Sequence, residues 1–220
     1  SGIAITQRVF GLILAAIALD RSQIVAAEGR CRRALRVFKA AGHRRGYAQA
    51  LCVMGSLWVF DGRFDDGVRL LRRALAMQQD VGNLFECARV RIAIAWAYED
   101  NHKGSAALAA EALHVAQEAD ATLLEAEALI LRALTSVRCG ALEHAGTCLR
   151  AACRIAEKSQ TRTLRALCHA TRAALLRRQG DVAAASLQLT SAFGLCGLNK
   201  RLLSRIERLS SPSPRQLASA

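Results

Sequence analysis

Small and apolar residues recur along this chain at helical spacing, in a pattern that returns at a regular interval. In the clearest unit, two helical faces flank a turn at Gly62 and consist of Leu51, Gly55 and Trp58 before it, and Gly67, Leu71 and Ala74 after it. These offsets predict two antiparallel helices whose backbones approach closely at the small residues, while the large residues fill the space between them.

The same unit can be followed through the whole chain. A small residue followed by a bulky or apolar one marks its second helix, at Ala34-Leu35, Ala74-Leu75, Ala112-Leu113, Ala152-Cys153 and Ala192-Phe193, so that successive marks lie roughly forty positions apart. Two helices per unit at this period are typical of a solenoid, in which every unit buries its apolar face against its neighbours. We therefore predict an all-α solenoid of about five helix-turn-helix repeats. Such a fold favours a binding function over a catalytic one.

The turns divide the chain into repeats at about 5–42, 46–82, 84–120, 123–160 and 162–197. Residues that tolerate positive φ close the helices within these units, at Asp61-Gly62, Asp100-Asn101, Cys139-Gly140 and Gly180-Asp181. Residues 198–209 carry leucine and isoleucine at helical spacing and are expected to form a C-terminal capping helix. We treat residues 1–209 as one repeat domain and 210–220, which hold both prolines, as a flexible tail or linker of a longer protein.

Composition agrees with a packed helical protein, since 52% of the residues are hydrophobic. The one membrane candidate, residues 9–19, has about half of the roughly 20 apolar residues that a spanning helix needs. A signal peptide with Arg8 as its charged region is the alternative. Because the segment falls in register with the later repeats, we interpret it as a helix of the first repeat and expect no membrane partner.

The motif Leu51-x2-Met54-Gly55-x2-Trp58-x3-Gly62-x-Phe64-x2-Gly67-x3-Leu71-x2-Ala74 resembles a tetratricopeptide repeat, and the resemblance covers about residues 5–195. Units of this length, with long second helices and without the usual proline, resemble the variant found in the sensor region of the maltose-regulon activator and related large ATP-binding LuxR-family regulators. The resemblance implies a right-handed solenoid that acts as a cytoplasmic sensor or scaffold in a bacterial transcriptional regulator. The ATPase and DNA-binding domains of such regulators are separate, and this sequence has neither a GxxxxGK[ST] motif nor a recognisable helix-turn-helix.

In a tetratricopeptide-like stack the first helices line a concave groove, and the resemblance places the following residues there: Gln49, Ser56, Phe60, Val90, Ile94, Tyr98, Glu127, Arg138, Arg177 and Arg178. This lining suits a peptide, a protein helix or a small amphiphile with an anionic end. Two alternatives stay open. The aliphatic residues can pack inside a tightly wound stack, and the arginines can complement helix dipoles at C-termini.

The chain carries a formal net charge of +13, which raises a second hypothesis. Basic residues form rows on three second helices: Arg32, Arg36 and Lys39; Arg69, Arg72 and Arg73; and Arg150, Arg154 and Lys158. Such rows can follow a phosphate backbone, but no aromatic residues are interleaved with them to stack on bases. Besides a nucleic-acid-binding solenoid, we keep open an adaptor that binds a partner domain or a second copy of itself.

No catalytic or metal-binding pattern is present in the sequence. The five histidines are dispersed, and the chain has no HExxH or GxSxG motif, so we predict that it is not an enzyme. The eight cysteines form no CxxC pair and are expected to be buried free thiols in a reducing compartment. His144, Cys148 and Cys153 could be drawn as ligands on one helix, but their spacing rotates Cys153 off the shared face. We expect no metal and no cofactor.

Overall fold

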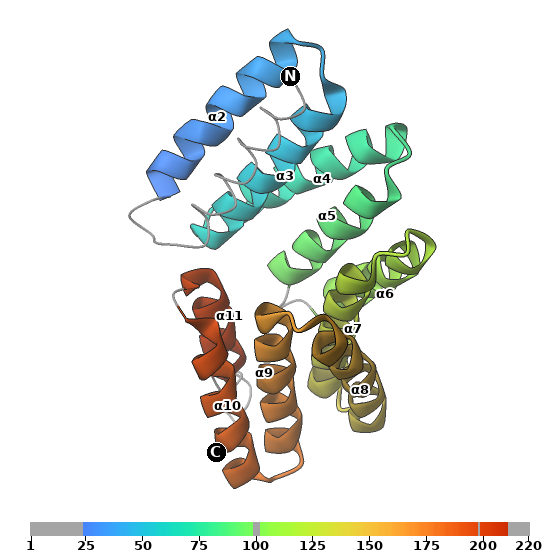
Figure 1. Cartoon of the computed structure of the whole chain (residues 1–220), viewed down its shortest axis with the longest axis vertical. Coiled ribbons are helices and arrows are strands. Elements are labelled where there is room, and N and C mark those ends of the chain that lie inside the picture. Colours follow the sequence, from blue (N-terminus) through green and yellow to red (C-terminus); the bar gives the residue numbers. More distant parts are fainter. Residues whose placement is uncertain (1–23, 99–101, 198, 211–220) are drawn as a thin grey trace. The chain divides into compact units, whose positions relative to one another are not determined.

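The computed structural model describes residues 24–98, 102–197 and 199–210, and within these ranges it contains ten α-helices and no strand (Figure 1). The predicted all-α fold is confirmed. The segment 9–19, the turn at Asp100-Asn101 and residues 211–220 lie outside the described residues. The chain divides between Leu124 and Glu125 into two compact units, each of which has its own sequence of packed helices.

The first unit contains five described helices, which are α2 (Ile24–Ala40), α3 (Arg44–Phe60), α4 (Phe64–Asp80), α5 (Leu84–Ala97) and α6 (His102–Glu118). Helices α2 to α5 pack consecutively, α5 also packs against α6, and α3 contacts α5. The predicted close approach of small residues occurs between α3 and α4, where Gly55 lies against Gly67. At the equivalent place in the next pair, Ser105 is buried, and its hydroxyl donates to the carbonyl of Ala95 at 3.0 Å.

The second unit is built from α7 (Thr122–Cys139), which begins at the boundary, and from α8 (Leu142–Ser159), α9 (Arg162–Arg178), α10 (Val182–Cys196) and α11 (Lys200–Ser210). Helix α9 packs against both α8 and α10. The helix predicted for 198–209 is present as α11. It packs against α9 and α10 and buries Leu202, Ile206 and Leu209.

Local chemistry explains where the helices begin and end. Asp181 starts α10 by accepting a hydrogen bond from the backbone N–H of Ala184 at 2.9 Å. Asn83 does the same for α5, through the N–H of Glu86. The predicted turns at Gly62, Gly140 and Gly180 are confirmed, because their φ values of 87°, 81° and 89° lie in the left-handed region that glycine adopts without strain.

Candidate functional site

A hollow of about 260 Å³ opens beside the turn between α2 and α3, and we call it the Arg73 hollow. Its lining consists of Phe38, Lys39, Gly42, His43, Arg44, Tyr47, Arg73 and Met77. The turn is held by His43, whose Nδ1 accepts a hydrogen bond from the N–H of Gly46 at 2.9 Å. The ring of His43 lies 5.5 Å from that of Phe38, and a Cβ added to Gly46 would lie within 2.8 Å of both side chains. A larger residue at position 46 would displace one of these two side chains.

Cationic side chains surround the aromatic part of the Arg73 hollow. The guanidinium of Arg73 lies over the ring of Tyr47, 5.7 Å from its centroid. Arg44 donates to the carboxylate of Asp80 at 3.2 Å, but neither Lys39 nor Arg73 has a carboxylate partner among the described residues. The lining itself contains three cations and no acidic side chain. Such a hollow can hold a flat apolar group and neutralise an anion attached to it.

The predicted groove residues of the first unit occupy different environments. Gln49 is half-buried, and its amide nitrogen donates to the carboxylate of Glu86 at 3.0 Å, which joins α3 to α5. Ser56 and Phe60 are also half-buried, and Phe60 packs against the core between α2 and α3.

Val90 and Ile94 do not lie on an open groove wall. They are 0% and 2% exposed, inside the core cluster that contains Leu51 and Leu71. They are covered because α3 and α5 contact each other and bury their facing sides. The alternative, in which the aliphatic residues pack inside the stack, describes both of them.

Tyr98, one of the two aromatic residues predicted to lie in the groove, contacts Phe64 and Arg72 of α4. Its ring meets that of Phe64 edge to face at 5.4 Å, and its hydroxyl accepts a hydrogen bond from Arg72 at 3.1 Å. The side chain is half-buried. Tyr98 therefore links α4 to the end of α5.

Two of the predicted groove residues of the second unit, Glu127 and Arg178, form contacts within that unit. Glu127 of α7 forms an ion pair with Arg205 of α11 at 3.7 Å, so α11 reaches one of the predicted contact residues. Arg178 donates to the backbone carbonyl of Arg138 in the last turn of α7, at 3.3 Å. That contact matches the helix-dipole alternative for these arginines. Arg177 and Arg178 are exposed, and Arg138 is half-buried.

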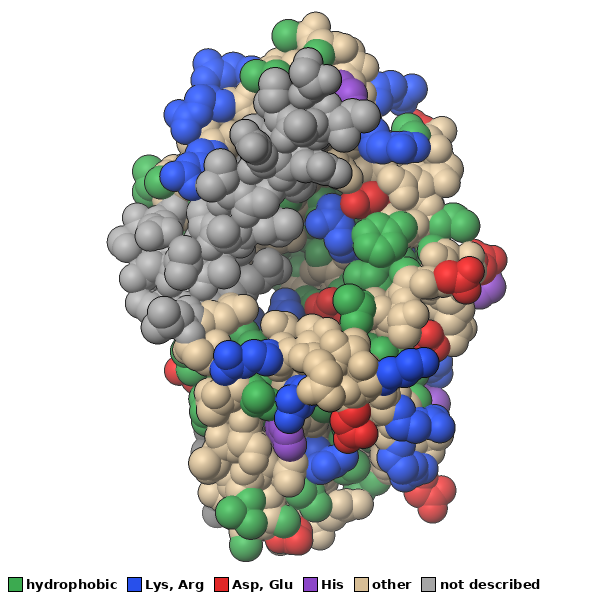
Figure 2. Space-filling model, in the orientation of Figure 1, with side chains coloured by type: hydrophobic (Ala, Val, Ile, Leu, Met, Phe, Trp, Pro, Cys, Tyr) green, Lys and Arg blue, Asp and Glu red, His purple; other side chains and the backbone are tan. Residues whose placement is uncertain are grey.

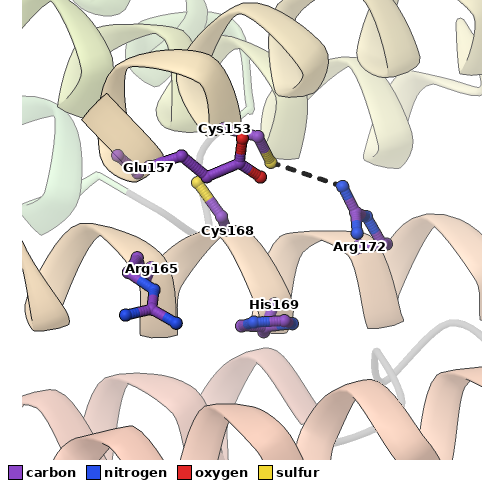
Figure 3. A pocket seen from close by; sticks show the side chains of 7 residues that line it. Cys153, Glu157, Arg165, Cys168, His169 and Arg172 are labelled. Carbon is purple, nitrogen blue, oxygen red and sulfur yellow. Dashed lines mark hydrogen bonds between the residues drawn. The ribbon is translucent and has the colours of Figure 1, made fainter. Parts of the chain in front are cut away.

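A second hollow, of about 100 Å³, lies between α8 and α9, and we call it the thiol hollow (Figure 3). It is lined by Cys153, Ala156, Glu157, Arg165, Cys168, His169 and Arg172. Figure 3 shows the side chains of Cys153 and Glu157 reaching down from α8, and those of Cys168 and Arg172 meeting them from α9. Arg165 and His169 point away from α8, and His169 is hydrogen-bonded to Gln188 of α10 at 2.8 Å.

The two thiols of this hollow have opposite electrostatic environments. A hydrogen bond with Cys168, together with the charge of Arg172, outweighs burial and the charge of Glu157 and lowers the pKa of Cys153 from its usual 9.0 to about 7. The same hydrogen bond, strengthened by burial, raises the pKa of Cys168 above its usual value. Arg172 donates directly to the Cys153 sulfur at 3.5 Å. The pair therefore favours one thiolate next to one neutral thiol.

Neither hollow is predicted by the sequence, although the sequence does single out one cysteine of the second. The sequence groups Cys153 with His144 and Cys148, and the structure does bring the latter two together, with Nε2 of His144 3.5 Å from Sγ of Cys148. Cys153 faces α9 instead, as its rotation off their shared face indicates. Among the described residues, no group of three potential ligands is arranged to hold a metal ion.

Several side chains of the basic rows have polar or acidic partners on their own helices. Arg32 pairs with Glu28 at 2.7 Å, Arg69 pairs with Asp66, and Arg150 donates to the hydroxyl of Thr147. Figure 2 shows acidic side chains among the basic ones over the helices of the second unit. An uninterrupted cationic stripe is not visible on this face.

Comparison with known proteins adds no assignment, because no protein-family model and no curated protein matches this sequence. Across the described residues, every helix is too short or too polar to cross a lipid bilayer.

Proposed function

We propose that this chain is a non-catalytic helical-repeat domain of the tetratricopeptide kind, a right-handed solenoid of about five repeats that binds a ligand or a protein. Support comes from the consecutive packing of neighbouring helices and from the glycine turns at Gly140 and Gly180, which lie one repeat length apart. The resemblance to regulator sensor regions suggests its place, a cytoplasmic sensor or scaffold region of a bacterial transcriptional regulator. Free cysteines throughout the described part of the chain agree with a reducing compartment.

The Arg73 hollow is the observation that carries the binding proposal. Most of the predicted groove residues form contacts inside their own unit. The Arg73 hollow, in contrast, has room for a ring system, and two of its lining cations have no carboxylate partner among the described residues. Burying an anion next to Lys39 and Arg73 would form charge-assisted hydrogen bonds, and Phe38, Tyr47 and Met77 would contact its apolar part. The ligand class is therefore an amphiphile with an anionic end, either a small molecule or an acidic side chain beside an apolar one on a protein helix.

The first experiment uses 1-anilinonaphthalene-8-sulfonate, a flat apolar ring system that carries one sulfonate. We expect saturable binding by the wild-type chain, observed as increased probe fluorescence. Arg73→Gln is expected to weaken it about tenfold, because the lost contact is a charge-assisted pair worth about 1.4 kcal/mol.

Arg154→Gln provides the matched control for this titration. Arg154 is exposed on α8 in the second unit, so its substitution removes the same charge outside the hollow. Equal loss of affinity in the two variants would mean that the probe responds to net charge alone, and the site assignment would fail.

The nucleic-acid hypothesis is separated from this proposal by a salt titration with duplex DNA. Phosphate-driven binding falls steeply as salt rises and depends on many basic residues rather than on Arg73. A mass measurement in solution separates the adaptor that self-associates, because a second copy occupying the hollow would make the chain dimeric and would block the probe.

A further inference from the structure

Cys153 and Cys168 approach each other from two neighbouring helices and belong to no CxxC motif. Both side chains line the thiol hollow, Cys153 from α8 and Cys168 from α9 (Figure 3). Both cysteines are present as free thiols. Because the two cysteines line one hollow from neighbouring helices, a disulfide between them would covalently join α8 to α9.

The surroundings give the two sulfurs different roles. Cys153 is half-buried beside the hollow, whereas Cys168 is only 5% exposed. Arg172 donates to the sulfur of Cys153 at 3.5 Å and stabilises negative charge there. Cys153 is therefore the more accessible of the two sulfurs to a reagent that enters the hollow. Cys168 lies deeper and is present as a neutral thiol.

We propose that Cys153 and Cys168 are a peroxide-responsive thiol pair, in which Cys153 is the attacking sulfur, Cys168 is the resolving sulfur, and Arg172 positions the Cys153 thiolate. The co-reactant is a small hydroperoxide such as hydrogen peroxide, which a hollow of about 100 Å³ can admit. This inference is independent of ligand binding at the Arg73 hollow, which lies in the other unit.

The chemistry balances in two steps. The Cys153 thiolate attacks one peroxide oxygen, the O–O bond breaks, and Cys153 becomes a sulfenic acid while the departing hydroxide takes up the proton that the thiol had released. The Cys168 sulfur then attacks the Cys153 sulfur, an S–S bond forms, and the hydroxyl leaves as water with the Cys168 proton. Two thiols are oxidised by two electrons in total, and one peroxide is reduced to two waters. A dithiol reductant reverses the change by thiol–disulfide exchange.

The site also predicts how the rate depends on pH. The groups that face the Cys153 sulfur are Glu157 on its own helix and Cys168 and Arg172 on α9, with Arg165 and His169 lining the rest of the hollow. Since Arg172 favours the thiolate, Arg172→Gln should shift the rise of the oxidation rate to higher pH, and Arg172→Lys should restore part of the effect. A purely structural role for Arg172 would not move this pH profile.

The test begins with the whole wild-type chain, treated with hydrogen peroxide, alkylated and digested with trypsin. Because arginines flank both cysteines, the expected product is a linked pair of peptides covering residues 151–154 and 166–172, about 2 Da lighter than the two free peptides together. Reduction with dithiothreitol should separate them. In Cys168→Ser, Cys153 should stop at the sulfenic acid, which dimedone traps.

Cys139 supplies the internal control, since it is exposed at the end of α7 and lies outside the thiol hollow. Cys153 should react with peroxide at least about tenfold faster than Cys139 at pH 7, because Arg172 donates to the Cys153 sulfur and stabilises its thiolate. Wild-type chain in which Cys153 reacts no faster than Cys139, or in which the linked peptides do not form, would overturn the proposal without any variant being needed.

Discussion

Gly55 of α3 and Gly67 of α4 face each other so closely that a Cβ added to either would lie 2.7 Å from the carbonyl oxygen of the other. The atoms around Gly55 cannot move aside easily, since they belong to backbone and to the buried side chain of Leu71. The small residues in the repeat are therefore a condition for the helices to pack.

Replacing either glycine by alanine should destabilise the first unit by about 2 kcal/mol or more, because overpacking forces the two helices apart. Both tryptophans, Trp58 and Trp96, lie in this unit, so the fluorescence change in a urea titration reports on it directly. Gly29→Ala is the control, since an added Cβ there meets nothing within 4 Å. Because Gly29 lies in the interior of α2, Gly29→Ala should stabilise the first unit by about 0.5–1 kcal/mol. A similar response at all three glycines would contradict the close approach.

The ion pair between Glu28 and Arg63 should make the first unit sensitive to acid. The hydrogen bond from Arg63, aided by Arg32 and opposed by burial, lowers the pKa of Glu28 from its usual 4.5 to about 2. Because the folded-state pKa is the lower one, the stabilisation is complete above pH 4.5 and disappears as the pH falls toward 2.

Glu28→Gln should accordingly lower the free energy of unfolding by about 1–2 kcal/mol at pH 7 and by almost nothing near pH 2. Glu111→Gln breaks the pair with Arg91, in which the glutamate is 60% exposed, and should cost less than about 0.5 kcal/mol at either pH. Urea titrations at the two pH values measure both variants. A cost for Glu28→Gln that does not change with pH would show that its charge is not what stabilises the fold.

Gln78 of α4 is an unusual core residue, since it is 0% exposed and neither amide atom has a hydrogen-bond partner among the described residues. A buried amide without partners loses its hydration and gains nothing in return. Gln78→Met, which keeps the volume and removes the polar atoms, should stabilise the first unit by about 1 kcal/mol. The exposed neighbour Gln79 gives the comparison, because Gln79→Met should leave the midpoint of a urea titration unchanged. Destabilisation by Gln78→Met would point to a partner for the amide.

Some features of this structure could be predicted because they depend on local chemistry. Gly62 and Gly140 mark turns through their backbone conformation, and Gly55 with Gly67 marks a close approach through its spacing within one repeat. The burial of Val90 and Ile94 could not be predicted in the same way. It depends on how closely α3 and α5 approach, and that distance is set by packing between repeats rather than within one.

The two hollows escaped prediction for a related reason. Tyr47 and Arg73 lie on different helices and meet only when α4 folds back on α3, while Cys153 and Cys168 meet only across α8 and α9. Neither pair has a spacing that is typical of a motif. Chemistry that arises between helices is visible only when the rotation of each helix about its own axis is known.

The most direct test of the binding proposal is an NMR titration of the ¹⁵N-labelled chain with 1-anilinonaphthalene-8-sulfonate, because it locates the probe as well as detecting it. The proposal predicts saturable shifts confined to amides around the Arg73 hollow, with Gly42, Gly46 and Tyr47 among the largest, and their loss in Arg73→Gln. Shifts spread over both units without saturation, or a binding site elsewhere that Arg73→Gln leaves intact, would contradict it.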